Sequence, residues 1–243
     1  MSFILPSDRY YHDDYNELLR YFGPSFHLGD CNSSDDKIGQ DRQNYADDDD
    51  FNRRTYTYCY QSIAIAVAGI HRPYIAKILE HTADSGPNSI IDVGSGGGQV
   101  GLALHTLGYN VSFADLYSES AKFLAWRLAE RRINRPLYLL DIRGVDIPVH
   151  DIAICFDVIE HLAPEGQHNL IHRCAELGRT VFMNLIHDER KIMNGVHYMV
   201  DTESLTEYIA DSWPIWYQDY YPDGNGNFRQ RLVVYGNGIQ ENQ

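Results

Sequence analysis

The chain has 243 residues, with 34 Asp and Glu against 20 Lys and Arg, which gives a formal net charge of −14 at pH 7. Hydrophobic residues make up 44% of the chain, enough to bury the core of one domain of ordinary size or one domain with a cap, so wholesale disorder is excluded. A surface this acidic repels phosphate backbones, and we therefore expect no nucleic-acid partner.

The apolar runs are too short to cross a bilayer, and the first residues have neither the basic nor the apolar region of a secretory signal. The four cysteines are far apart and form no C-x-x-C pair, which argues against a zinc knuckle or a disulfide framework. We expect a cytoplasmic protein with reduced cysteines and no membrane partner.

Residues 1–85 are predicted to form an N-terminal aromatic, helical lid segment. Aromatic residues cluster between Tyr10 and Phe26, and a polar stretch then ends in four consecutive aspartates at 47–50. Because like charges repel, we expect this run to be a solvated loop. Apolar spacing between Arg54 and Glu80, broken by Pro73, predicts one helix or two short ones.

Residues 86–243 are predicted to form the core, in which short β-rich runs alternate with helical patterns. Such alternation is typical of a parallel sheet covered on both faces, and a final pair of strands joined by a turn indicates an antiparallel hairpin at its edge. We expect strands at 89–93, 110–114, 137–140, 151–156, 180–185, 215–221 and 228–235, and helices at 99–107, 118–132, 164–177 and 202–211.

The strongest functional signal is a glycine-rich run, Asp92-Val93-Gly94-Ser95-Gly96-Gly97-Gly98, between the first strand and its helix. Glycines allow backbone torsions with positive φ and bring main-chain amides close to a ligand, and the positive end of the following helix points into the same space. The run therefore predicts a loop that cradles a nucleoside-bearing cofactor. A dinucleotide remains open, because Gly96, Gly98 and Gly101 also satisfy G-x-G-x-x-G.

Acidic residues at the ends of the next strands help to separate these cofactors. Asp115 ends the second strand, where a carboxylate can accept hydrogen bonds from both ribose hydroxyls of a cofactor without a 2′-phosphate. Asp141 and Asp157 close the third and fourth strands, at the edge where open α/β sheets bind ligands. An acid at 141 can accept from an adenine amine, which a nicotinamide dehydrogenase rarely needs.

With these motifs the sequence resembles the class I S-adenosylmethionine-dependent methyltransferases of small molecules, over residues 86–236. Residues 157–162, Asp-Val-Ile-Glu-His-Leu, look like the segment after strand four in ubiquinone-type enzymes. The resemblance implies a seven-stranded, mostly parallel Rossmann-like sheet with an antiparallel C-terminal hairpin, an N-terminal helical lid, and S-adenosylmethionine as cofactor. The glycine loop would hold the methionine part, Asp115 the ribose, and Asp141 with Ile142 the adenine. The implied cofactor-binding residues are Asp92, Gly94, Ser95, Gly96, Gly98, Asp115, Leu116, Asp141, Ile142 and Asp157.

A second resemblance involves the aromatic N-terminal segment at residues 21–29, which looks like the lid that precedes the core in several small-molecule methyltransferases. Those lids often continue with Tyr-Trp, whereas this chain has Asp30-Cys31. Plain aromatic packing of an N-terminal helix is the alternative interpretation.

Histidines are the candidate proton acceptors, because their pKa lies near neutrality. His161 and His187 follow the fourth and fifth strands and are the predicted catalytic residues, while His27 and His197 could approach from the lid side. His168 and His172 are spaced i, i+4 on a helix, but no acidic third ligand accompanies them, and we expect no metal.

The sequence thus predicts a methyltransferase acting on an O or N nucleophile of a small organic molecule, such as a natural product. A peptide or protein acceptor is the alternative within this class of enzyme. A non-catalytic binding module with the same fold, or an NAD-dependent dehydrogenase, is the alternative outside it.

Overall fold

The structure is a computed structural model that describes residues 9–23, 34–84, 88–141, 145–189, 192, 197–222 and 228–237. It divides into two compact units, unit 1 within Met1–Pro87 and Ser95–Val145 and unit 2 within Asn88–Gly94 and Asp146–Gln243. These units do not follow the predicted boundary at residue 85, which stays a prediction. Within the described residues no helix combines the length and apolar character that crossing a membrane requires.

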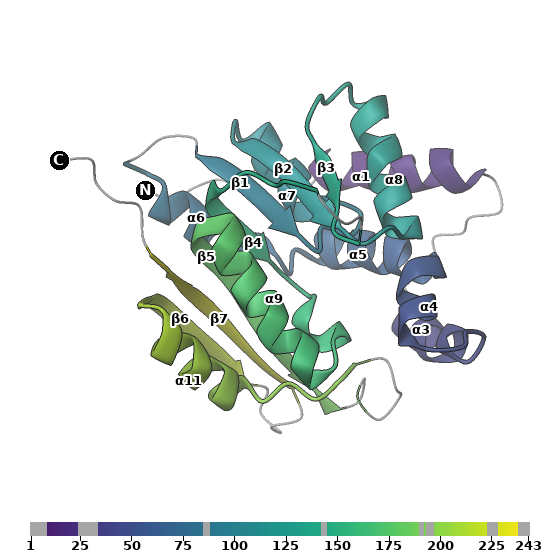
Figure 1. Ribbon diagram of the computed structural model, residues 1–243. Helices are drawn as coiled ribbons and strands as arrows, with labels where there is room; N and C mark the ends of the chain where they lie inside the picture. Colours follow the sequence, from purple (N-terminus) through teal and green to yellow (C-terminus); the bar gives the residue numbers. More distant parts are fainter. Residues whose placement is uncertain are drawn as a thin grey trace. The chain divides into compact units, whose positions relative to one another are not determined.

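Unit 1 contains two parallel strands and most of the helices (Figure 1). Its core joins Leu18, Cys59, Ile63 and Phe123, all nearly inaccessible to solvent, so the N-terminal helix packs into this unit through its apolar face. The helices are α1 (Arg9–Phe22), α3 (Ser34–Arg42), α4 (Asp48–Arg54), α5 (Thr57–Ala68), α6 (Arg72–His81), α7 (Gln99–Thr106) and α8 (Glu119–Glu130), and the strands are β2 (Asn110–Asp115) and β3 (Leu137–Leu139).

The aspartate run differs from its prediction, because residues 48–50 form the first turn of helix α4 instead of a solvated loop. Asp47 caps this helix by accepting a hydrogen bond from the Asp50 N–H at 2.8 Å. Carboxylates in a first turn interact favourably with the positive end of the helix dipole, which offsets their mutual repulsion. Arg53 and Arg54 then pair with acids one turn earlier. Between Arg54 and Glu80 the structure has two helices, and Pro73 lies in the first turn of α6.

Unit 2 contains five strands, of which β1, β4 and β5 are parallel and β5, β7 and β6 antiparallel. Helix α9 packs on β4 and β5, and α11 packs against β7 (Figure 1). The strands are β1 (Ser89–Val93), β4 (His150–Cys155), β5 (Gly178–Asp188), β6 (Ile215–Pro222) and β7 (Phe228–Gly236), and the helices are the 3-10 turn η2 (Ile159–His161), α9 (Pro164–Leu177) and α11 (Thr202–Ser212).

The strands follow the order β3-β2-β1-β4-β5-β7-β6 in one seven-stranded sheet. This mostly parallel sheet with an antiparallel C-terminal hairpin confirms the predicted α/β, Rossmann-like fold. Strand β5 extends three residues beyond its predicted end at Leu185, because its pairing with β7 runs from Thr180 to Asp188.

Candidate functional site

Three glycines of the glycine-rich loop, Gly94, Gly96 and Gly98, have positive φ, and the first two differ in what surrounds them. A Cβ on Gly94, at φ +72°, would lie 2.4 Å from a methyl group of Val158, so packing in unit 2 requires glycine there. A Cβ on Gly96, at φ +52°, would meet no described atom within 4 Å. The space beside Gly96 is therefore open, as a site for a ligand requires.

The Asp115 carboxylate, at the end of β2, holds this loop in unit 1. Its Oδ2 accepts from the Gly96 N–H at 2.5 Å, and its Oδ1 accepts from the Leu116 N–H at 2.7 Å. Each carboxylate oxygen keeps a further lone pair that can accept from a ribose hydroxyl. Burial raises the pKa of Asp115 to about 6, although both amide donors lower it, and nearby Asp141 adds to the increase.

Ser95 adds a polar group to the same loop. Its side chain is 8% exposed, and its Oγ makes no hydrogen bond with any residue that the structure describes. A buried hydroxyl costs free energy when its hydrogen bonds are unmade, so a polar ligand beside the loop would stabilise it. The open side of Gly96, the Asp115 carboxylate and the Ser95 hydroxyl together fit a hydroxyl-bearing nucleoside.

Asp141, the residue predicted to contact adenine, forms an ion pair with Arg53 of helix α4. Its Oδ2 accepts from Arg53 Nη1 at 2.5 Å, and its Oδ1 accepts from the Tyr117 N–H at 3.1 Å. Partial burial raises the pKa of Asp141, but the Arg53 guanidinium and the Tyr117 amide together hold it below its ordinary value. Arg53 and Tyr117 also line a surface cleft of about 320 Å³. Ile142, the other predicted adenine contact, lies outside the described residues.

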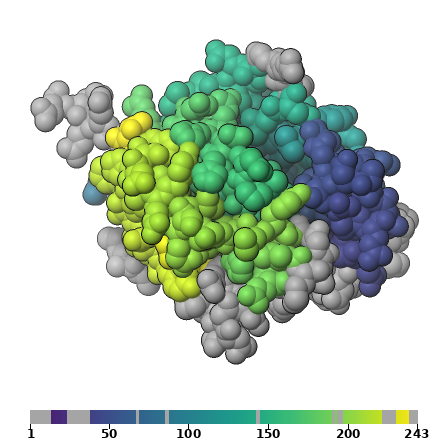
Figure 2. All heavy atoms as spheres, turned by 60° about the horizontal axis from the view of Figure 1, so that its bottom comes forward, coloured from purple at the N-terminus to yellow at the C-terminus, as the bar shows by residue number. Residues whose placement is uncertain are grey.

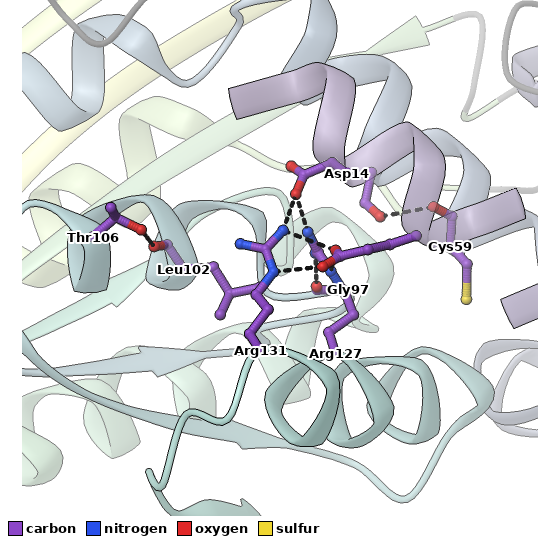
Figure 3. Close-up of polar contacts among 9 residues, drawn as sticks. Asp14, Cys59, Gly97, Leu102, Thr106, Arg127 and Arg131 are labelled. Atoms are coloured by element: carbon purple, nitrogen blue, oxygen red, sulfur yellow. Dashed lines mark hydrogen bonds and ion pairs between the residues drawn. The ribbon is translucent and has the colours of Figure 1, made fainter. Parts of the chain in front are cut away.

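Behind the loop lies a buried ionic cluster that the sequence analysis missed (Figure 3). Arg127 of α8 is fully buried and donates to the Gly97 carbonyl oxygen, to Asp14, and to Glu17 at 2.7 Å. Arg131, one turn later, donates to the same two carboxylates of α1. Burial raises the pKa of Glu17, but the two guanidinium groups hold it below its usual value. Through Arg127 the cluster connects the glycine-rich loop to the N-terminal helix α1.

The predicted acids Asp92 and Asp157 lie in unit 2. Asp92, on β1, is 5% exposed. Asp157 follows β4 and has φ +57°, a left-handed conformation that is uncommon outside glycine and is found at functional sites. Asn184 of β5 fixes this conformation, because its Oδ1 accepts from the Asp157 N–H at 2.8 Å and its Nδ2 donates to the carboxylate at 2.6 Å.

The two predicted catalytic histidines have different surroundings in unit 2. His187 Nδ1 lies 3.1 Å from the Val200 carbonyl oxygen, which can only accept. Nδ1 must therefore carry the proton, and Nε2 of the neutral ring keeps a lone pair that can take one. His161 lies in η2, where its ring packs edge to face on that of His197, with the centroids 4.8 Å apart. His27 lies outside the described residues.

The helix histidines His168 and His172 both contact Tyr208 of helix α11. Helices α9 (green) and α11 (lime) appear together on the face shown in Figure 2. The Tyr208 hydroxyl hydrogen-bonds to His172 Nε2, and the His168 ring packs edge to face on Tyr208. A different group, Glu160, His161 and His197, places donor atoms close enough to hold a cation.

No protein-family model matches the chain. It is similar to the Ubiquinone biosynthesis O-methyltransferases of two strains of Rickettsia bellii, with 26% identity over 125 residues. The match covers 50% of this chain and 52% of each relative, so the chain spans about half the length of the curated relatives it matches.

The fold of this chain resembles solved structures of methyltransferases. The magnesium protoporphyrin IX methyltransferase of Synechocystis PCC 6803, with bound SAM, has 17% identity and a TM-score of 0.57, over 83% of this chain and 97% of that chain. The N-methyltransferase NodS of Bradyrhizobium japonicum WM9, in complex with S-adenosyl-L-homocysteine, has 10% identity and a TM-score of 0.53, over 68% of this chain and 85% of that chain. The predicted fold, that of class I methyltransferases, is thereby confirmed.

Proposed function

We propose that this protein is an S-adenosylmethionine-dependent methyltransferase, which transfers a methyl group to an O or N nucleophile of a small organic molecule. One observation carries the proposal. The Asp115 carboxylate binds the Gly96 amide at 2.5 Å, beside the open face of the glycine loop. This arrangement brings a hydroxyl acceptor and an open backbone surface together within unit 1, as a nucleoside requires.

The residues of unit 1 would bind and orient the cofactor. Asp115 accepts hydrogen bonds from the ribose hydroxyls, the Ser95 hydroxyl gains a partner, and the loop holds the methionine part. For Asp141 to accept from the adenine amine, it must share its carboxylate with Arg53 or release it. Bound S-adenosylmethionine supplies a methyl group on a positively charged sulfur, so the protein mainly has to position the acceptor.

His187 is the proposed general base of unit 2, because its Nδ1 donates to the Val200 carbonyl and its Nε2 can accept a proton from the acceptor. His161 was predicted for the same role. It stays a second candidate, and its ring lies beside His197, within a group of donor atoms that includes Glu160.

A small acceptor is favoured by the similarity to a ubiquinone biosynthesis enzyme and a protoporphyrin methyltransferase. A peptide or protein acceptor is the alternative. For a small acceptor we expect turnover with a panel of phenols and amines, measured as S-adenosylhomocysteine release. Turnover with peptides alone would show that the methyl acceptor is a peptide or protein.

Calorimetry tests the cofactor. We expect the protein to bind S-adenosylmethionine and S-adenosylhomocysteine and not NAD or NADP. Gly96→Val should abolish that binding by filling the space a ligand occupies, while Gly108→Val is the matched control. Gly108 also has a positive φ, +99°, and a Cβ added at this position would meet no described atom within 4 Å.

Binding of NADH with no response to the adenosyl compounds would replace the proposal by a dehydrogenase. Cofactor binding without turnover on any acceptor in the panel would favour a non-catalytic module.

A further inference from the structure

We propose that Glu160, His161 and His197 form a binding site for a divalent transition-metal cation, such as Zn²⁺. Within the described parts of the chain, these residues are the group of three His, Cys, Asp or Glu side chains whose ligand atoms lie together, all within 4.8 Å of one another. All three belong to unit 2.

The ligands come from two segments of the chain. Glu160 and His161 are neighbours in the 3-10 turn η2 after β4, and His197 lies in the segment that leads into α11. The side chains of Glu160 and His197 are 2% and 8% exposed, while His161 is half-buried. Two buried donors beside one that water reaches leave a side from which a ligand can approach.

Backbone contacts hold the two segments together without using the ligand atoms. The Tyr198 N–H donates to the Glu160 carbonyl oxygen at 2.8 Å. Buried Gln167, on α9, donates through its Nε2 to the Leu162 carbonyl at 3.0 Å and to the Met199 carbonyl at 3.1 Å. The segments on either side of the donor atoms are therefore fixed, which reduces the ordering that a cation would have to impose.

The donor set indicates which cation fits. Two imidazoles and one carboxylate form a common ligand set of catalytic zinc and of other first-row divalent metals, whereas Mg²⁺ prefers oxygen ligands alone. A metal about 2.1 Å from each donor brings neighbouring donors to about 3.0–3.5 Å. Side-chain rotations that shift the ligand atoms by about an ångström would close the observed spacing. With neutral imidazoles the set carries one negative charge, so the bound cation keeps a net positive charge.

Three protein ligands leave at least one coordination position open. A hydroxyl bound there would become more acidic, because a bound Zn²⁺ lowers the pKa of a coordinated water to about 7. If the proposed methyltransferase function holds, the acceptor that fits best is a molecule with a hydroxyl group, so that oxygen is the methylated atom. This last step rests on the proposed function, whereas the cation site does not.

Binding of Co²⁺ tests the site directly, since this ion takes zinc sites and gives visible absorption that reports its coordination. We expect the metal-stripped full chain to bind one Co²⁺, with bands typical of nitrogen and oxygen ligands, and added Zn²⁺ to displace it. His197→Ala and Glu160→Gln should each weaken Co²⁺ binding by at least about tenfold, since even the loss of a residue that only orients a metal ligand costs about 10–100-fold. Circular dichroism checks that each variant is folded.

His168→Ala is the matched control, because His168 is an exposed histidine of unit 2 whose ring packs on Tyr208. It should leave Co²⁺ binding unchanged. The site is ruled out if wild type gives no cobalt spectrum, or if folded His197→Ala and Glu160→Gln bind Co²⁺ as wild type does. Calorimetry with S-adenosylmethionine on the same samples separates the two proposals, because failure to bind it would overturn the function while leaving the cobalt result intact.

Discussion

The two units carry two kinds of polar site, and the comparison shows how each is suited to a different ligand. In unit 1 the carboxylates of Asp115 and Asp14 accept hydrogen bonds from backbone amides and guanidinium groups, so both charges have partners within the protein. In unit 2 the His187 Nδ1 faces the Val200 carbonyl oxygen, and the ligand atoms of Glu160, His161 and His197 lie within 4.8 Å of one another. The first arrangement is fixed and suits recognition, whereas the second can take protons or cations.

The largest effect on the unit 2 side is expected from His187→Ala. If Nε2 of His187 is the base, turnover should fall by about 10²–10⁴-fold, while affinity for S-adenosylmethionine stays the same. His161→Ala, measured alongside, separates the two histidines. Turnover of both variants within about threefold of wild type would leave catalysis to positioning alone.

Arg127→Met should have the largest effect on the unit 1 side. It removes the fully buried one of the two guanidinium partners of Asp14 and Glu17 and leaves them Arg131 alone, and breaking a buried pair costs up to about 3–5 kcal/mol. Urea unfolding measures the loss in free energy of unfolding. Arg131→Met is the control and should cost less, because the Arg131 side chain is 19% exposed and water can replace part of its contacts. Equal losses would show that the Gly97 contact of Arg127 adds nothing.

Asp115→Ala tests whether recognition depends on this carboxylate. Loss of a charged acceptor for the ribose hydroxyls should weaken S-adenosylmethionine binding by about 1–3 kcal/mol, measured by calorimetry. Asp84→Ala, which removes an exposed acid of the same unit outside the predicted site, serves as the control. Unchanged affinity in Asp115→Ala would place the ribose contact elsewhere.

The pH dependence of binding sharpens the same point. Burial raises the pKa of Asp115 in the folded state to about 6, above its ordinary value. Protonation of this carboxyl at low pH therefore favours the folded state, and this contribution to the free energy of unfolding is lost as pH rises through 6. Ribose hydroxyls donate to the ionised form, so affinity should instead rise about tenfold from pH 5 to pH 7. Asp115→Asn should give weaker, pH-independent binding. An identical pH profile in that variant would assign the titration to another group.

The smallest effect is expected at the ion pair between Arg53 and Asp141. Arg53→Ala frees the Asp141 carboxylate for an adenine amine and should tighten S-adenosylmethionine binding by less than about fivefold, since exposed pairs contribute up to about 1 kcal/mol. Arg54→Ala, which removes a partner of Asp50, should leave affinity unchanged. A weaker affinity in Arg53→Ala would mean that this guanidinium supports the site.

Local patterns predicted much of the fold, because each strand of the core is a short apolar run bounded by turns, and each helix has a periodic apolar face. The loop at Gly96 and the acid at Asp115 were predictable since both are tied to a strand end. The aspartate run was misjudged, because its repulsion was weighed without the helix dipole and the arginines that follow it.

The parts that escaped prediction depend on residues far apart in the chain. Arg127 is a basic residue on an amphipathic helix, and in sequence nothing distinguishes it from an exposed one. Glu160 and His161 stand together in the sequence, but only the fold brings His197 to them. The sequence did contain one signal for this site. Glu160 and His161 follow a predicted strand, and His197 precedes a predicted helix.

The contact between Arg127 and helix α1 has a consequence for how the chain reaches its final form. Glu17 and Arg127 are 110 residues apart, so their pairing closes a long loop, and contacts of such separation form slowly. The same guanidinium also donates to the Gly97 carbonyl oxygen, so docking of α1 orients a side chain that contacts the glycine-rich loop. A fragment that begins after α1 would leave Arg127 without its two carboxylates, so we expect such a fragment to fold less stably than the full chain.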